Sequence, residues 1–226
     1  MKKGNPSACA GCAVSPQEKV CLNRKGKGAR GCPTMTKKKL LDRVRKEYQG
    51  KDIREFARQA SIQEAECYAG RDKKPYVMHP TKPRIREICE FARRMNYHRL
   101  GLVFCGGLFK EAAIVEQILQ AQGFETVSVV CKVGSVPKEE IGLKEEEKIF
   151  IGEYESLCNP ILQAAIVNDA KTDFNIMLGL CVGHDSLFFK YAEAPTTVLA
   201  VKDRVSGHNP LGPVYLWENY YSWLKT

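Results

Sequence analysis

The 226-residue sequence predicts a doubly wound α/β fold, Rossmann-like or flavodoxin-like, with a mostly parallel sheet and a small cysteine-rich metal module and helices in front of it. Two observations predict this arrangement. From residue 85 onward, apolar runs of strand length alternate with helical segments of roughly 10 to 15 residues, the pattern of parallel βαβ units. Before them, residues 1–36 hold four cysteines and almost no apolar periodicity.

The N-terminal part needs a source of stability other than a hydrophobic core. After the cysteine-rich residues, apolar side chains at helical spacing begin at Thr36 and predict two short helices interrupted at Gly50. Residues 70–83 are rich in Pro, Lys and Gly and predict a linker. We therefore place a four-cysteine metal module with basic helices at residues 1–70 and the α/β domain at residues 71–226.

Within the α/β domain, four apolar runs predict strands. They lie at residues 100–105, 126–131, 174–181 and 196–201. Helical patterns separate them and also precede the first. These predicted helices lie near residues 85–95, 112–119, 159–170 and 186–192.

Charge is distributed unevenly along the chain. Residues 1–100 hold 25 Lys and Arg against 10 Asp and Glu, whereas residues 101–226 hold 10 against 16. A basic half suits nucleic acid, anionic lipid, an acidic protein or an anionic metal–thiolate centre of its own. No apolar run is long enough for a membrane span, and residues 1–12 lack the apolar region of a signal peptide, so we expect a cytoplasmic protein without a membrane partner.

Ten cysteines in a cytoplasmic chain favour metal binding or thiol chemistry over disulfides. The first four form a C-x2-C-x8-C-x10-C pattern. They are Cys9, Cys12, Cys21 and Cys32. A CxxC pair brings two thiolates to one metal, and the longer loops return two more, so the pattern predicts a four-thiolate site that supplies the missing folding energy.

The spacing leaves the metal open, because all-cysteine shells suit zinc and iron–sulfur clusters alike. Pro33 after the last cysteine resembles the ending of bacterial ferredoxin motifs, but the remaining spacing does not. Basic residues between the cysteines offset the charge of four thiolates, or else contact nucleic-acid phosphates.

A second set of cysteines falls at the ends of predicted strands or just before a helix. The set is Cys105, Cys131, Cys158 and Cys181. Because ligands of open parallel sheets bind outside the carboxyl ends of the strands, we predict that these four form a second cysteine-lined metal site. We assign Cys89 to the core and leave Cys67 without a role.

Two other interpretations of these cysteines stay open. The first is that each of them, taken alone, is a buried thiol of the core, since free cysteine behaves as a small hydrophobic residue. Thiol catalysis is the other alternative: Cys105 precedes Gly106-Gly107 and a helix start, which lowers a thiol pKa. Cys181 has His184 and Asp185 nearby, which suggests a triad, although such close neighbours rarely present nucleophile and base correctly. We favour Cys181 as a ligand with His184 and Asp185 in support.

Several short motifs resemble an uncharacterised family of bacterial and archaeal proteins described only as predicted metal-binding. The motifs are the cysteine-rich N-terminus, Cys158-Asn159-Pro160, GLCVGHD from Gly179, VKDR from Val201 and GHNP from Gly207. The resemblance spans nearly the whole chain and implies metal binding without an established reaction.

The last two motifs follow the fourth predicted strand and belong at the same sheet edge. Lys202 and Arg204 suit an anionic substrate or a cluster's charge, and His208 suits proton donation. Together with His184 and Asp185 they are the candidate catalytic residues. The alternative is a rigid turn around Asn209-Pro210.

The sequence therefore predicts a protein with two cysteine-ligated centres, which we favour as iron–sulfur clusters of the 4Fe–4S type because thiolates from distant strands suit a cluster. Such a protein transfers electrons or acts on a small substrate with a redox partner protein. The alternative is a zinc-binding, non-enzymatic module for nucleic acid or an acidic protein.

Overall fold

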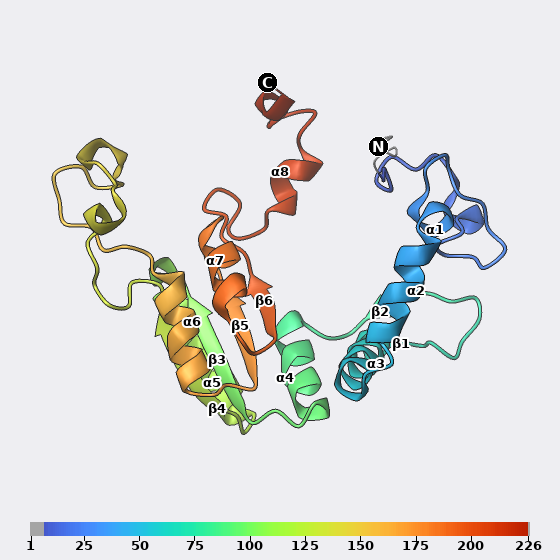
Figure 1. Ribbon diagram of the computed structural model, residues 1–226, viewed down its shortest axis with the longest axis horizontal. Coiled ribbons are helices and arrows are strands. Elements are labelled where there is room, and N and C mark those ends of the chain that lie inside the picture. The colour runs from blue at the N-terminus through green and yellow to red at the C-terminus, as the bar shows by residue number, and fades with distance from the viewer. Residues whose placement is uncertain (1–6, 226) are drawn as a thin grey trace. The chain divides into compact units, whose positions relative to one another are not determined.

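The structure, a computed structural model, describes residues 7–225 (Figure 1). The chain divides into two compact units, residues 1–62 and residues 63–226. The boundary falls inside the long helix α3 (Lys51–Glu66), so that only the last turn of this helix belongs to the second unit.

The first unit consists of cysteine-bearing loops followed by helices. Its helical elements are η1 (Pro16–Glu18), α1 (Pro33–Thr36), α2 (Lys38–Glu47) and most of α3. The break between α2 and α3 at Gly50 confirms the predicted interruption. None of residues 7–62 is buried, and the apolar side chains of α2, such as Leu40 and Val44, are largely exposed. This unit therefore has no hydrophobic core among its described residues.

A short strand pair forms at the segment predicted as a linker, with one strand just before residue 70 and the other within the segment. Strand β1 (Tyr68–Ala69) pairs antiparallel with β2 (His79–Pro80), and the Thr81 amide donates to the Cys67 carbonyl over 2.8 Å. The residues between the strands are mostly exposed, as expected of a linker rich in Pro and Lys.

The second unit is built on a four-stranded, wholly parallel sheet in the order β4-β3-β5-β6. The strands are β3 (Arg99–Phe104), β4 (Glu125–Val130), β5 (Phe174–Leu178) and β6 (Thr196–Ala200). All four overlap predicted strands, and the doubly wound α/β fold is confirmed. Strand β5 ends at Leu178, before its predicted end, so Cys181 lies in the loop after the strand. From β3 the chain adds β4 on one side, and it then adds β5 and β6 on the other side of β3. The switch point of the strand order therefore lies between β3 and β5.

Helices connect the strands by crossovers. They are η2 (Gly106–Leu108), α5 (Phe109–Ala121), η3 (Lys138–Ile141), η4 (Glu145–Glu147), α6 (Pro160–Asp169) and α7 (His184–Tyr191); α4 (Arg84–Arg94) precedes β3, and α8 (Leu211–Tyr215) and η5 (Ser222–Lys225) follow β6. Because crossovers are right-handed, the reversal after β4 puts α5 on one face and α6 and α7 on the other. In agreement, α6 and α7 pack on each other.

One layer of the core lies between the sheet and the α6–α7 pair, and further buried side chains come from α4 and α5. Every residue of β5 is buried, as expected for a central strand of a parallel sheet. The cluster beneath α6 and α7 contains the sulfurs of two cysteines as well as aliphatic and aromatic side chains. Its buried members are Val103, Cys105, Val129, Cys131, Ala164, Val167, Met177, Leu180 and Phe188. Cys89, assigned to the core from the sequence, is also buried, on α4.

No helix within residues 7–225 combines the length and the apolar character that a membrane crossing requires. This agrees with the absence of a long apolar run in the sequence.

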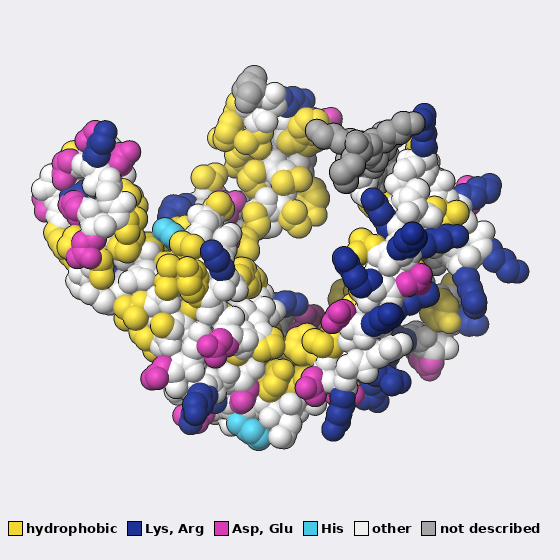
Figure 2. Space-filling view, viewed as in Figure 1, with side chains coloured by type: hydrophobic (Ala, Val, Ile, Leu, Met, Phe, Trp, Pro, Cys, Tyr) yellow, Lys and Arg dark blue, Asp and Glu magenta, His cyan; other side chains and the backbone are white. Residues whose placement is uncertain are grey.

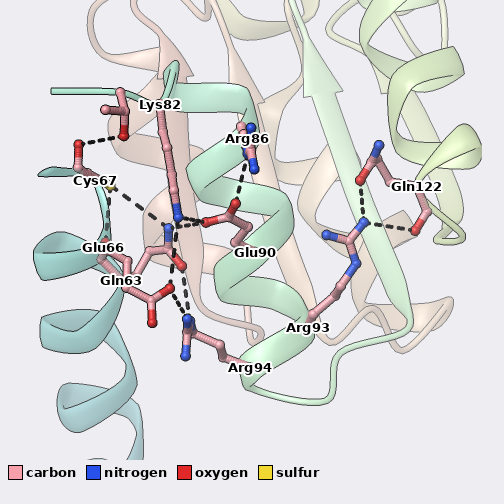
Figure 3. A network of polar contacts seen from close by, with 10 residues as sticks. Gln63, Glu66, Cys67, Lys82, Arg86, Glu90, Arg93, Arg94 and Gln122 are labelled. Carbon is pink, nitrogen blue, oxygen red and sulfur yellow. Dashed lines mark hydrogen bonds and ion pairs between the residues drawn. The ribbon is translucent and has the colours of Figure 1, made fainter. Parts of the chain in front are cut away.

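A polar network joins the last turn of α3 to α4 within the second unit (Figure 3). The Glu90 carboxylate accepts hydrogen bonds from Gln63 over 2.9 Å and from Arg86 over 2.8 Å, and it also pairs with Lys82. Burial opposes ionisation of Glu90, but the hydrogen bonds from Lys82, Gln63 and Arg86 outweigh it and lower its pKa to about 2. The network therefore holds the carboxylate in its charged form.

We expect the second unit to lose stability in acid through Glu90. A carboxyl group whose pKa is lowered on folding contributes stability above its unfolded pKa, and this contribution disappears as the pH falls from about 4.5 toward 2. Glu90→Gln should therefore reduce the free energy of unfolding at pH 7 by at most about 3 kcal/mol. The difference from the unsubstituted protein should shrink toward pH 2. Urea unfolding followed by circular dichroism measures both.

Glu193→Gln is the matched control, because Glu193 is exposed. A Glu90→Gln protein whose deficit is equally large at pH 7 and pH 2 would contradict the role assigned to the charge.

Candidate functional site

The carboxyl edge of the sheet gathers the cysteines that follow its strands. Cys105 directly follows β3, and Cys131 directly follows the neighbouring strand β4. Two hydrogen bonds fix them side by side: the Cys131 amide donates to the Phe104 carbonyl over 2.8 Å, and the Gly106 amide donates to the Cys131 sulfur over 3.3 Å. Both thiols are buried, Cys131 with 2% of its surface exposed and Cys105 with 8%.

Cys158 reaches the same place from a distant part of the chain. The amide of Asn159 donates to the Cys131 carbonyl over 2.7 Å, which holds residue 158 against the end of β4. The Asn159 side chain then caps α6 by accepting a hydrogen bond from the Leu162 amide over 3.0 Å. As a result, Cys158 stands immediately before the capped N-terminus of α6 and is half-buried.

Ion pairs shape the segment between β4 and α6, which delivers Cys158. The Lys148 side chain is only 4% exposed and is held by Glu139 and Glu145. Glu155 is likewise buried, pairs with Lys138 and accepts the Ile149 amide over 2.8 Å. These ion pairs and hydrogen bonds order the segment that returns the chain to the sheet edge.

The thiols form a chain of contacts with Cys131 in the middle. Cys131 lies next to Cys105 on one side and next to Cys158 on the other, close enough for each thiol to affect the ionisation of its neighbour. The row of neighbouring side chains extends at both ends, since His184 at the start of α7 affects the ionisation of Cys158, and Lys202 after β6 affects that of Cys105. Five side chains from five segments therefore meet at the predicted edge.

These contacts separate the protonation behaviour of the three thiols. Hydrogen bonds with Cys105 and Cys158, together with burial, raise the pKa of Cys131. The Cys131 hydrogen bond, followed by that of His184, lowers the pKa of Cys158 against the effect of burial. The Cys131 hydrogen bond, opposed by burial and assisted by the Gly107 amide and Lys202, likewise lowers the pKa of Cys105. Of the three thiols, Cys131 is therefore the one that keeps its proton. It has a single proton, which can be donated to either Cys105 or Cys158.

Gln163 is a residue of the site that the sequence did not reveal. It is fully buried on α6, and its side-chain amide donates to the Val129 carbonyl over 2.7 Å and to the Phe104 carbonyl over 3.3 Å. Since these carbonyls lie just before Cys131 and Cys105, Gln163 fixes both strand ends under α6. The only sequence signal is a polar residue at an apolar position of a helix, which is too common to single out.

Cys181 lies apart from the contact chain. Its sulfur accepts a hydrogen bond from Arg204 over 3.2 Å, and its carbonyl accepts the His184 and Asp185 amides at the start of α7. The Asp185 carboxylate accepts the amides of Gly183 and Ser186. Because His184 bonds with Cys158 instead, the structure does not assemble a triad of Cys181, His184 and Asp185.

His208 braces the loop after β6. Its Nδ1 atom accepts a hydrogen bond from the Asp203 amide over 3.2 Å, while the Asp203 carboxylate accepts the amides of Val205 and Ser206. His208 therefore has the structural role expected of a rigid turn. Lys202 and Arg204, in contrast, contact cysteine sulfurs.

The first unit brings its own four cysteines to one place. Cys9, Cys12, Cys21 and Cys32 line a single pocket of about 110 Å³. Lys19 and Arg30 line it as well, together with backbone around Gly31. Four residues spread over the N-terminal loops therefore share one cavity, as the spacing of the motif predicts.

Neither cluster is arranged as a finished metal site. Among residues 7–225, no three or more His, Cys, Asp or Glu side chains already stand close enough to hold a metal ion. In the first unit the thiols converge on a common cavity, whereas at the sheet edge they form a line through Cys131. The four thiols and the two basic side chains in the lining of the N-terminal pocket fit a metal–thiolate centre.

The fold and the site define an α/β protein with a thiol cluster at the carboxyl edge of a parallel sheet. The chain belongs to the family described as a protein of unknown function, DUF1847, whose model matches residues 32–199. The matched range contains all four predicted sheet-edge cysteines and Cys32, while Cys9, Cys12 and Cys21 precede it. The resemblance to an uncharacterised family is confirmed.

A relative in Methanocaldococcus jannaschii, named as uncharacterized protein MJ0455, is 44% identical over 171 residues. The aligned residues cover 76% of this chain and 85% of the relative. No solved structure matches the chain.

We expect Cys158 to react as a thiolate at a lower pH than an ordinary cysteine. Alkylation of a thiol with a pKa near 8.5 accelerates roughly 75-fold between pH 6 and pH 8, because the thiolate fraction rises by that factor. The lowered pKa of Cys158 should flatten this profile, and His184→Gln should steepen it. The measurement is the iodoacetamide alkylation rate of the tryptic peptide 149–171, whose single cysteine is Cys158.

The same peptide in urea-unfolded protein provides the reference. Equal pH profiles in the folded and unfolded chains would show that the contacts of Cys158 do not affect its ionisation.

Proposed function

We propose that this protein is a cysteine-ligated metalloprotein whose N-terminal centre is held by Cys9, Cys12, Cys21 and Cys32. The observation that carries this proposal is that all four thiols line one small cavity. The described loops of the first unit bury no side chain, so that van der Waals packing contributes little to their order. Metal–thiolate bonds supply folding free energy in such segments.

Charge supports a thiolate centre in this cavity. Four thiolates around a divalent ion leave a net negative charge, and Lys19 and Arg30 stand in the lining to balance it. In residues 7–62, the basic side chains that pair with a carboxylate are Lys27, Arg45 and Arg58, which leaves the two lining residues available.

We favour an iron–sulfur cluster over zinc, and electron transfer as its role. An iron–sulfur cluster supplies one-electron chemistry, whereas zinc has no redox chemistry of its own. The thiols at the sheet edge are a second redox-capable group in the same chain, which supports a redox function with a partner protein. The second metal centre at Cys105, Cys131, Cys158 and Cys181 stays a prediction. We place the protein in the cytoplasm, where such thiols stay reduced.

A zinc module that binds nucleic acid is the second candidate function. The space-filling view shows Lys and Arg side chains gathered over the helices of the first unit (Figure 2). Salt-dependent binding to nucleic acid would support this function, because each phosphate contact releases counterions.

Metal content and colour test the main proposal. Protein purified without oxygen should contain iron and acid-labile sulfide and absorb in the visible range, and Cys12→Ser should lose most of this metal because it removes one of four ligands. Cys89→Ala is the control, since Cys89 is a buried core residue of the second unit and should keep the metal. Colourless protein that holds only zinc would overturn the iron–sulfur assignment, and metal-free protein would overturn the proposal as a whole.

A further inference from the structure

The sheet-edge thiols divide into one that solvent can reach and one directly behind it. Cys158 is half-buried at the end of the returning segment, next to His184. Cys131 is 2% exposed and sits in the core cluster with Val103, Val129 and Phe188. The Asn159 amide donates to the Cys131 carbonyl over 2.7 Å, and Cys158 packs against the buried cluster that contains Cys131, so the two residues are held side by side. An accessible thiol backed by a buried partner is the arrangement that thiol–disulfide exchange requires.

We propose that Cys158 and Cys131 form a dithiol couple that reduces low-molecular-weight disulfides. The Cys158 thiolate attacks one sulfur of the substrate disulfide, forms a mixed disulfide with it and expels the other half as a thiolate, which takes up a proton. Cys131 then loses its proton, attacks the Cys158 sulfur and expels the second half. One substrate disulfide becomes two thiols, and the protein gains one disulfide, so that two electrons pass from the protein to the substrate.

The surroundings of Cys158 favour a small substrate with carboxylate groups. A half-buried sulfur beside a helix start admits a small molecule more readily than a folded protein surface. Lys132 follows Cys131 directly and attracts negative charge at Cys158, and the Lys202 ammonium contacts Cys105 at the other end of the chain of thiols. The peptide amides at the capped start of α6 add a positive end of the helix dipole. These groups together complement an anionic disulfide.

The proposal goes beyond the N-terminal metal centre and does not depend on it. The exchange uses the two thiols and the substrate alone, and reduction of the protein disulfide by an external dithiol completes a cycle. Loss of metal from the first unit should therefore leave it intact.

Oxidised glutathione is the test substrate, applied to the reduced full-length chain. The sequence suits peptide mapping, because trypsin separates the relevant cysteines onto different peptides: 100–110 with Cys105, 111–132 with Cys131, 149–171 with Cys158 and 172–190 with Cys181. The expected result is a disulfide-linked pair of peptides 111–132 and 149–171, with two equivalents of glutathione released for each pair formed.

Single substitutions assign the two steps. Cys131→Ser should trap glutathione on peptide 149–171 and slow release of the second thiol by roughly a hundredfold or more, because a contact within the protein is replaced by a collision between molecules. Cys158→Ser should abolish the linked pair. Cys181→Ser should retain the pair and is the matched control, since Cys181 is similarly exposed but bonds with Arg204.

Three results would overturn the proposal. They are the absence of the linked pair in the unsubstituted protein, release of the second thiol by Cys131→Ser at the original rate, and metal that persists without the four N-terminal cysteines but disappears on Cys158→Ser. The last result would assign the thiols to a metal centre. None of them bears on the N-terminal metal, so the two proposals fail separately.

Discussion

The backbone of Cys131 is the point on which the sheet-edge site depends. Its amide bonds with the end of β3 through Phe104, and its carbonyl bonds with Asn159 at the start of α6. One residue thus connects the central strand, an edge strand and a helix that comes from a charged loop. Both main-chain groups are engaged and the Gly106 amide donates to the Cys131 sulfur, which positions this sulfur between Cys105 and Cys158. Gln163 reinforces the same junction from above.

The two units reach order by different physical means. The second unit buries continuous apolar strands under helices, so its order comes from the hydrophobic effect and from backbone pairing. The described residues of the first unit bury nothing, and the feature that their loops share is a cavity lined by four thiols. In such a unit, metal–ligand bonds supply folding free energy that packing does not supply.

Hydrophobic periodicity was sufficient to predict the sheet. The four strands follow from apolar runs such as residues 174–178, and their alternation with helices predicts the doubly wound class, but the strand order β4-β3-β5-β6 was not predicted. The meeting of Cys105, Cys131 and Cys158 follows from the same rule about strand ends. Contacts that depend on side-chain direction were beyond prediction: nothing in GLCVGHDS indicates that His184 bonds with a cysteine 26 positions away, or that Cys181 turns to Arg204. Gln163 belongs to the same class, because its role exists only once two strand ends lie beneath it.

Because Cys131 lies inside the core, the reduction potential of the proposed couple is linked to the free energy of unfolding. Its sulfur packs with the buried side chains that hold α6 and α7 on the sheet, so any change in its bonding alters the packing of that layer. Reduction potential and unfolding free energy then form one linkage cycle: whatever tightens the oxidised core more than the reduced core makes the disulfide harder to reduce. Substitutions on the buried face of α7, such as those at Phe188, would therefore change the reduction potential of the couple without altering either sulfur.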